Sequence, residues 1–143
     1  MREVKRSALL PYTATQMFDL VADVERYPEF LPWCTAATVL AREGEMVTAQ
    51  LALSRGRASA RFTTRNRLVP GQFLEMRLLE GPFRSLEGRW DFVAIGEAGS
   101  RVELAIAFET QGSLAGIVLG PVFEGICNQL VDAFAQRARR VYG

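Results

Sequence analysis

The chain has 143 residues, of which 49% are hydrophobic, and its formal net charge is +1. This length suits one domain with one core, and this composition excludes a disordered or fibrous protein. The chain contains no histidine, which removes Ser/His and Cys/His catalytic pairs and the imidazole ligands of most catalytic zinc sites. We therefore expect a single domain over residues 1–143, with no metal and no required cofactor.

Sequence features that govern localisation point to the cytoplasm. We expect no membrane-spanning segment, because no apolar run reaches the length that spanning requires, and residues 1–12 lack the apolar stretch of a signal peptide. Cys34 and Cys127 lie far apart and have no metal-ligand spacing, so we expect two buried thiols that behave as small hydrophobic residues.

The N-terminal elements are a strand and a helix. Residues 3–10 predict a strand that ends at Pro11. Thr13 and Gln16 form a capping-box pattern at the start of a helix over residues 13–24, whose apolar residues recur at helical spacing. The Tyr27-Pro28 pair discourages its continuation, so any second helical turn is expected at residues 30–32.

The central segment, residues 35–110, predicts six strands separated by five turn sequences. Apolar and charged residues alternate most clearly in SLEGRWDFV, residues 85–93, and in RVELAIAFE, residues 101–109. A sheet with one apolar and one charged face is antiparallel and covered on one side only. A further element must therefore cover the apolar face.

The covering element is a C-terminal helix over about residues 115–142. Its apolar positions recur at steps of three or four, as in Phe123, Ile126 and Leu130. Proline is best tolerated in the first helical turn, so the well-formed helix is expected from Pro121 onward. The predicted fold class is α+β, in the order strand, helix, short helix, six strands and long helix.

Four sequence motifs in this order resemble those of one protein family. They are SALLPYTATQMFDLVADVERYPEFLPWC, FTTRN, EGPFRSLEGRWDF and FEGICNQLVDAFAQRARRVYG. The resemblance is to the bacterial RatA proteins and their mitochondrial coenzyme Q-binding relatives, within the START-like, polyketide cyclase-related superfamily. It implies a helix-grip fold, in which a curved antiparallel sheet wraps the long C-terminal helix and leaves an elongated cavity.

The resemblance also implies two functions. Relatives carry apolar ligands in the cavity, ubiquinone in the mitochondrial proteins, whereas RatA is a factor that binds the large ribosomal subunit and blocks subunit association. We expect Tyr27 to Cys34 to lie across one end of the cavity, either as a gate or as plain packing. The expected cavity residues are Phe30, Leu31, Trp33, Phe62, Thr64, Asn66, Met76, Trp90, Phe92, Phe108, Phe123, Ile126, Leu130 and Phe134.

Arginines gather on the opposite face of the strand that carries FTTRN. Residues 55–67 contain no acid, and strand alternation turns the arginines away from the cavity. This Arg stripe consists of Arg55, Arg57, Arg61, Arg65 and Arg67. It is a candidate contact for ribosomal RNA or anionic lipid headgroups, and its alternative is a solvated face neutralised by cross-strand acids.

The acidic residues give little support to the second alternative, a polyketide cyclase-like enzyme. Glu87, Asp91 and Glu103 fall on the outward face of their strands, where a carboxylate is not desolvated into a general base. We therefore expect a non-catalytic protein that binds an apolar ligand, of ubiquinone or isoprenoid type. The first alternative is a ribosome association inhibitor, and peripheral contact with the inner membrane and the oligomeric state are left open.

Overall fold

The computed structural model describes residues 1–143 and has the predicted order of elements. Strand β1 is followed by helix α1 and by a 3-10 helix, η1, before the six remaining strands and the long helix α2. The bounds are β1 Arg2–Leu10, α1 Ala14–Ala22, η1 Val24–Glu29, β2 Cys34–Glu43, β3 Met46–Arg55, β4 Ala58–Val69, β5 Phe73–Glu80, β6 Phe83–Ile95, β7 Gly99–Thr110 and α2 Leu114–Tyr142.

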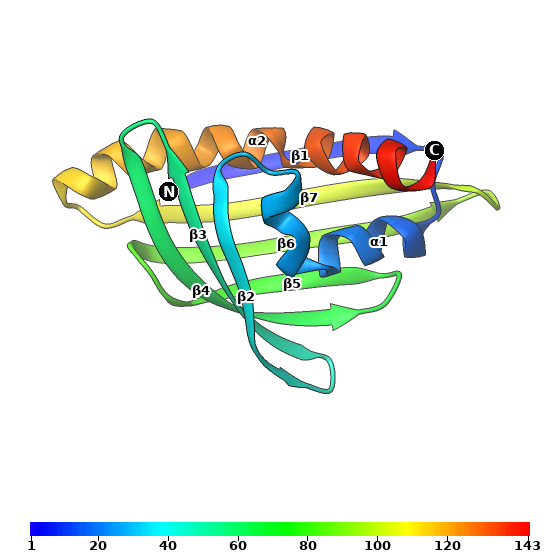
Figure 1. The fold of residues 1–143 in the computed structure, drawn as a ribbon, viewed down its shortest axis with the longest axis horizontal. Helices are drawn as coiled ribbons and strands as arrows, with labels where there is room; N and C mark the ends of the chain where they lie inside the picture. Colours follow the sequence, from blue (N-terminus) through cyan, green and yellow to red (C-terminus); the bar gives the residue numbers. More distant parts are fainter.

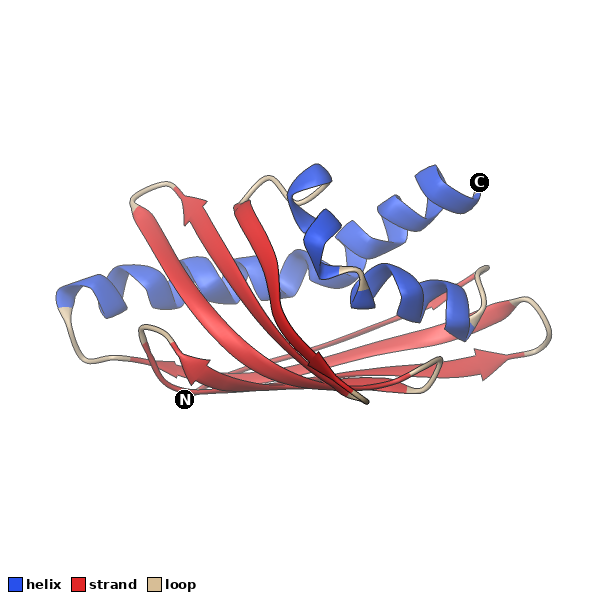
Figure 2. Cartoon of the chain, turned by 60° about the horizontal axis from the view of Figure 1, so that its bottom comes forward, coloured by secondary structure: helices blue, strands red, loops and turns tan.

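All seven strands form one antiparallel sheet in the order β1-β7-β6-β5-β4-β3-β2. The hairpin strands β2 and β3, together with β4, run steeply across the direction of the other strands, so the sheet is strongly curved (Figure 1). Figure 2 shows that both α-helices lie on one side of the sheet and that its other side is free of helices. The predicted helix-grip fold is confirmed.

The start of α1 follows from its capping box. The Thr13 hydroxyl accepts a hydrogen bond from the Gln16 backbone N–H, and the Gln16 side chain accepts one from the Thr13 N–H, as predicted. The expected second turn over residues 30–32 is wrong, because the 3-10 helix spans Val24–Glu29 and contains Pro28. A 3-10 turn tolerates this proline because the tight i to i+3 bonding of so short a piece uses few backbone donors.

Helix α2 begins earlier than expected. Ser113 caps it, and the helix continues through Pro121 without a break. Its flanking residues Leu119 and Phe123 are buried against the sheet, so tertiary packing outweighs the cost of one missing backbone hydrogen bond. The side chain of Pro121 is exposed on the outer side.

By length and composition alone, α2 would be long and apolar enough to cross a membrane, contrary to the expectation from the sequence. The same helix supplies much of the core, because residues such as Ile126 and Phe134 are almost completely buried. Some apolar side chains of α2 point outward in its first turns, where Leu114 and Ile117 are exposed.

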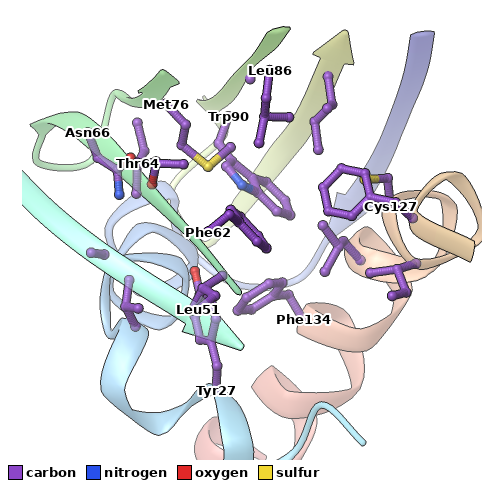
Figure 3. A pocket seen from close by; sticks show the side chains of 18 of the residues that line it. Tyr27, Leu51, Phe62, Thr64, Asn66, Met76, Leu86, Trp90, Cys127 and Phe134 are labelled. Atoms are coloured by element: carbon purple, nitrogen blue, oxygen red, sulfur yellow. The ribbon is translucent and has the colours of Figure 1, made fainter. Parts of the chain in front are cut away.

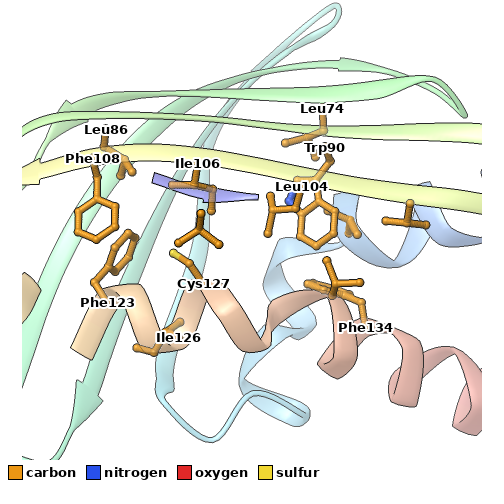
Figure 4. Packing of buried hydrophobic residues seen from close by; sticks show 14 of the residues in the cluster. Leu74, Leu86, Trp90, Leu104, Ile106, Phe108, Phe123, Ile126, Cys127 and Phe134 are labelled. Atoms are coloured by element: carbon orange, nitrogen blue, oxygen red, sulfur yellow. The ribbon is translucent and has the colours of Figure 1, made fainter. Parts of the chain in front are cut away.

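Aromatic side chains between α2 and the sheet form the centre of the core (Figure 4). Phe123 of α2 contacts the rings of Phe83 and Phe108 at centroid distances of 4.9 and 4.8 Å. Further along the helix, Phe134 packs edge-on against Trp90 of β6 at 5.3 Å. Such edge contacts add about 0.5–1.5 kcal/mol to the burial of each ring. The two ring clusters fix α2 over the sheet.

A glycine pair in α2 tests how closely its first turns approach the preceding chain. A Cβ at Gly116 would lie 1.8 Å from the Gln111 carbonyl oxygen, whereas a Cβ at Gly125 would meet no atom within 4 Å. We expect Gly116→Ala to lower the free energy of unfolding by about 1–3 kcal/mol through this overlap. Gly125→Ala should raise it by about 0.5–1 kcal/mol, because alanine is the better helix former. Urea denaturation measures both, and equal effects would show that the approach at Gly116 is not tight.

Candidate functional site: an apolar cavity under the long helix

A cavity of about 80 Å³ lies between the concave face of the sheet and α2. Figure 3 shows side chains from η1, the sheet and α2 pointing toward this common space. Nineteen residues line it and 16 of them are hydrophobic, the other three being Thr64, Asn66 and Gly88. No charged side chain is among them, so the cavity is an apolar chamber with one small polar region.

Ten of the residues expected at the cavity line it. They come from the turn just before β2, from β4, β5 and β6, and from the inner face of α2. They are Trp33, Phe62, Thr64, Asn66, Met76, Trp90, Phe123, Ile126, Leu130 and Phe134.

Four residues expected at the cavity do not line it. Phe30 lies on the outer side of Phe134, with its ring under the Arg137 guanidinium, and Leu31 is buried beside the 3-10 helix. Phe92 packs against Phe18 of α1, and Phe108 packs into the ring cluster around Phe123. Strand alternation identified the correct face for Phe92 and Phe108, but both sit where a helix covers that face directly.

Nine lining residues were not named as cavity residues from the sequence. Most are aliphatic positions on the same inner faces of strands, and alternation in MVTAQLALSR could have revealed those of β3. They are Val24, Tyr27, Ala49, Leu51, Leu74, Leu86, Gly88, Ile106 and Cys127. Of the segment expected across one end of the cavity, residues 27–34, Tyr27 and Trp33 lie on the cavity wall.

The polar region of the wall is formed by Thr64 and Asn66, which share the inner face of β4 (Figure 3). Asn66 is only 3% exposed, and its side-chain oxygen Oδ1 has no hydrogen-bond partner. Its neighbours across the sheet are Val47 of β3 and Met76 of β5, which offer no strong partner. A buried carbonyl without a partner is rare in proteins, and this one belongs to a residue that lines the cavity.

Trp33, Leu51 and Leu130 are among the partly buried wall residues, and we place the mouth of the cavity there. They lie just before β2, in β3 and in α2. Two polar links join α2 to β3 and to η1. Arg55 Nη1 donates to Gln129 Oε1 at 3.2 Å, and Arg137 Nη2 lies 3.0 Å from Glu29 Oε1.

The floor of the cavity depends on one glycine. Met76 of β5 lies opposite Gly88 of β6, and a Cβ at position 88 would come within 2.6 Å of the Met76 methyl group. Glycine therefore gives the Met76 side chain the room in which it lies.

On the other side of β4, Arg61, Arg65 and Arg67 are exposed as expected, whereas Arg57 lies in the turn before β4 and Arg55, at the end of β3, reaches Gln129 of α2. Of the cross-strand acids, Glu75 and Asp91 form ion pairs with Arg89, and Glu87 lies opposite Arg77 without forming an ion pair. Of the stripe, Arg67 alone forms an ion pair, with Glu45 at 3.2 Å. Arg65 instead lies directly opposite Arg77 of β5, an exposed arginine that sequence reasoning had not assigned to the stripe.

Burial strongly suppresses ionisation of two groups on the wall. Desolvation, with smaller effects from Cys34 and Asp23, raises the pKa of Tyr27, whose hydroxyl donates to the Val21 carbonyl. Desolvation, with a smaller effect from Glu124, raises the pKa of the Cys127 thiol to about 12. Both groups are neutral at physiological pH, and neither acts there as a base or a thiolate nucleophile.

A curved sheet, a long covering helix and an apolar cavity between them define a START-like, helix-grip protein. The family model described as "Polyketide cyclase / dehydrase and lipid transport" matches residues 10–135, and the chain belongs to this family. Within it, the chain belongs with the RatA and coenzyme Q-binding proteins.

Three individual matches support this assignment. The chain is 51% identical to a ribosome association toxin RatA of Pseudomonas aeruginosa, over 98% of this chain and 97% of that protein. It is 28% identical to a mitochondrial coenzyme Q-binding protein homologue of Xenopus laevis, over 99% of this chain and 59% of that protein. The crystal structure of an aromatase/cyclase from a Streptomyces species matches the fold with a TM-score of 0.86 at 19% identity, covering 97% of this chain and 94% of that one.

The raised pKa values predict how stability depends on pH. The folded state holds the Cys127 and Tyr27 protons more tightly than the unfolded chain, so their contribution is present at neutral pH and is lost as pH rises above about 9. We expect the free energy of unfolding to fall from about pH 9 to 12, by about 1 kcal/mol per pH unit for each titrating group. In Cys127→Ala the slope should be shallower, as measured by urea denaturation at each pH. An unchanged slope would show that this thiol ionises in the folded state as it does in water.

Proposed function

We propose that the protein binds a neutral, elongated apolar molecule of the isoprenoid quinone type in its cavity, without transforming it. The observation that carries the proposal is the chemistry of the wall, which is hydrophobic at 16 of 19 positions and has no charged side chain. Such a wall disfavours fatty acid carboxylates and phosphate headgroups, because burying an unpaired charge costs far more than burying an apolar chain gains.

The same wall argues against a polyketide cyclase-like reaction. General acid–base catalysis requires a titratable group within hydrogen-bond reach of the substrate, and no carboxylate, histidine or lysine lines the cavity. The candidate acids Asp91 and Glu103 are engaged in ion pairs with Arg89 and Arg101. The named relatives with sequence similarity are toxins and a binding protein, whereas the aromatase/cyclase is similar in fold alone.

Ligand entry requires the cavity to widen. Its volume of about 80 Å³ is below the ~300–1,000 Å³ of pockets that hold drug-sized ligands. The mouth is suited to widening, because the Arg55–Gln129 and Arg137–Glu29 links are partly exposed and each contributes only about 0–1 kcal/mol. Parting the Arg55–Gln129 link would separate β3 from α2 at little cost, whereas Tyr27 and Phe30 also hold the η1 segment to α2 through their contacts with Phe134.

Both tryptophans of the chain, Trp33 and Trp90, line the cavity, so intrinsic fluorescence reports on its occupancy. We expect decylubiquinone, a quinone with a short tail, to quench this fluorescence saturably. Leu130→Arg should weaken binding at least tenfold, because it places an unpaired charge at the cavity wall.

The matched control is Gln136→Arg, which adds the same charge at an exposed position of the same helix and should leave binding unchanged. Circular dichroism establishes that both variants are folded. The proposal is wrong if no quinone or neutral isoprenoid gives saturable quenching, or if a folded Leu130→Arg protein binds as well as wild type.

A second function, association with the large ribosomal subunit, is supported by the Arg stripe and by the names of the RatA relatives. Arg65 and Arg77 are like charges directly across neighbouring strands, an arrangement that costs stability. Along β4, the part of the stripe from Arg61 to Arg67 extends over roughly 20 Å at the usual rise per residue. A phosphate backbone laid on this face would compensate the repulsion, and this role would place the protein in the cytoplasm.

We expect the double variant Arg61→Gln with Arg65→Gln to co-sediment less with the large subunit. Its binding should also be less sensitive to salt, because fewer phosphate contacts release fewer counterions on binding. Neither arginine has an ion pair, so each change should alter stability by less than about 0.5 kcal/mol. The matched control removes the same charge at the exposed pair Arg139 and Arg140 of α2. Equal co-sedimentation of both double variants and wild type would exclude the stripe as the contact, and quinone affinity should be unchanged throughout.

A further inference from the structure

We infer that the cavity selects a ligand whose polar end carries a hydroxyl group, so that a quinol or another phenol binds more tightly than the corresponding quinone. The inference rests on the proposed binding function and specifies its ligand. It starts from the one polar atom of the wall that is buried and has no partner, Asn66 Oδ1.

The surroundings of Asn66 leave a ligand as the natural partner for this oxygen. The residue is 3% exposed, and its two cross-strand neighbours are the apolar side chains of Val47 and Met76. The amide lies on the wall of the cavity, where the remaining lining, apart from Thr64 and Gly88, is hydrophobic. An unpaired carbonyl in such a place costs stability in the empty protein, and a donor brought by the ligand would recover that cost.

The rest of the cavity wall limits which kind of donor group a ligand can bring to Asn66 Oδ1. An ammonium group would donate but would arrive as a charge with no carboxylate to pair with, which the apolar wall disfavours. A quinone carbonyl accepts hydrogen bonds only; it can accept one from the Asn66 Nδ2 group but leaves Oδ1 unpaired. A hydroxyl donates to Oδ1 while remaining neutral, and the Thr64 hydroxyl, two residues away on the same face of β4, can donate to it in turn.

A pair of air-stable probes tests the donor alone. 4-Nonylphenol and 4-nonylanisole have the same ring and tail, and the second replaces the hydroxyl hydrogen by a methyl group. We expect tryptophan fluorescence titration to give an affinity about tenfold higher for the phenol, as one well-made hydrogen bond to a buried acceptor would produce. Under anaerobic conditions, decylubiquinol should likewise bind more tightly than decylubiquinone.

Asn66→Leu is the variant that assigns the preference to this residue. Leucine has a similar size and no acceptor, so the ratio of phenol to anisole affinity should fall to about one while the anisole still binds. The melting temperature of the empty variant should stay the same or rise by a few degrees, because a buried unpaired carbonyl has been removed. A lower melting temperature would mean that a protein group or bound water satisfies Asn66, and would overturn the inference.

The possible results separate this inference from the proposed function. If phenol and anisole bind wild-type protein equally, the inference is wrong and apolar ligand binding stands. If the phenol preference persists in folded Asn66→Leu, the donor is recognised elsewhere and the assignment to Asn66 fails. If neither probe, neither ubiquinone form and no other isoprenoid binds, the proposed function fails and the inference fails with it.

Discussion

A seven-stranded antiparallel sheet with one apolar face must bury that face, and in this protein a single helix covers most of it. Helix α2 contacts the sheet through two ring clusters, around Phe123 and around Phe134. The cavity lies where Ile126, Cys127 and Leu130, between these clusters on the helix, face the concave side of the sheet. The cavity is therefore a geometric consequence of how the core is closed.

The order of elements and the facing of strands could be predicted because each depends on local chemistry. The Thr13–Gln16 capping box and the alternation through Trp90 are examples. Features that depend on distant contacts were missed. Packing on both sides of Pro121 keeps α2 continuous, and α1 covers Phe92, which therefore lies in the core and not on the cavity wall. The alternation of side chains along a strand predicts which face of the sheet a residue is on. It does not predict which element packs against that residue.

The two faces of β4 have opposite chemistry and are separated by one backbone. Phe62, Thr64 and Asn66 face the cavity, and Arg61 and Arg65 face solvent. Because neighbouring residues of a strand point to opposite faces, a ligand that moves the backbone of β4 necessarily moves the arginines as well. The fold thus provides a mechanical connection between an apolar cavity and a positively charged surface, which is relevant to a family whose members are named for both coenzyme Q binding and ribosome association.

The contact of Met76 with Gly88 has an evolutionary consequence. Alanine differs from glycine by one nucleotide in the codon, and at position 88 its Cβ would come within 2.6 Å of the flexible end of Met76, while the nearest sheet backbone atom, the Ala105 carbonyl oxygen, would stay at an ordinary contact distance of 3.7 Å. One mutation would therefore change the shape of the cavity wall by displacing a flexible side chain. Proteins that share this architecture can diverge in the shape of their cavities long before their overall structures differ.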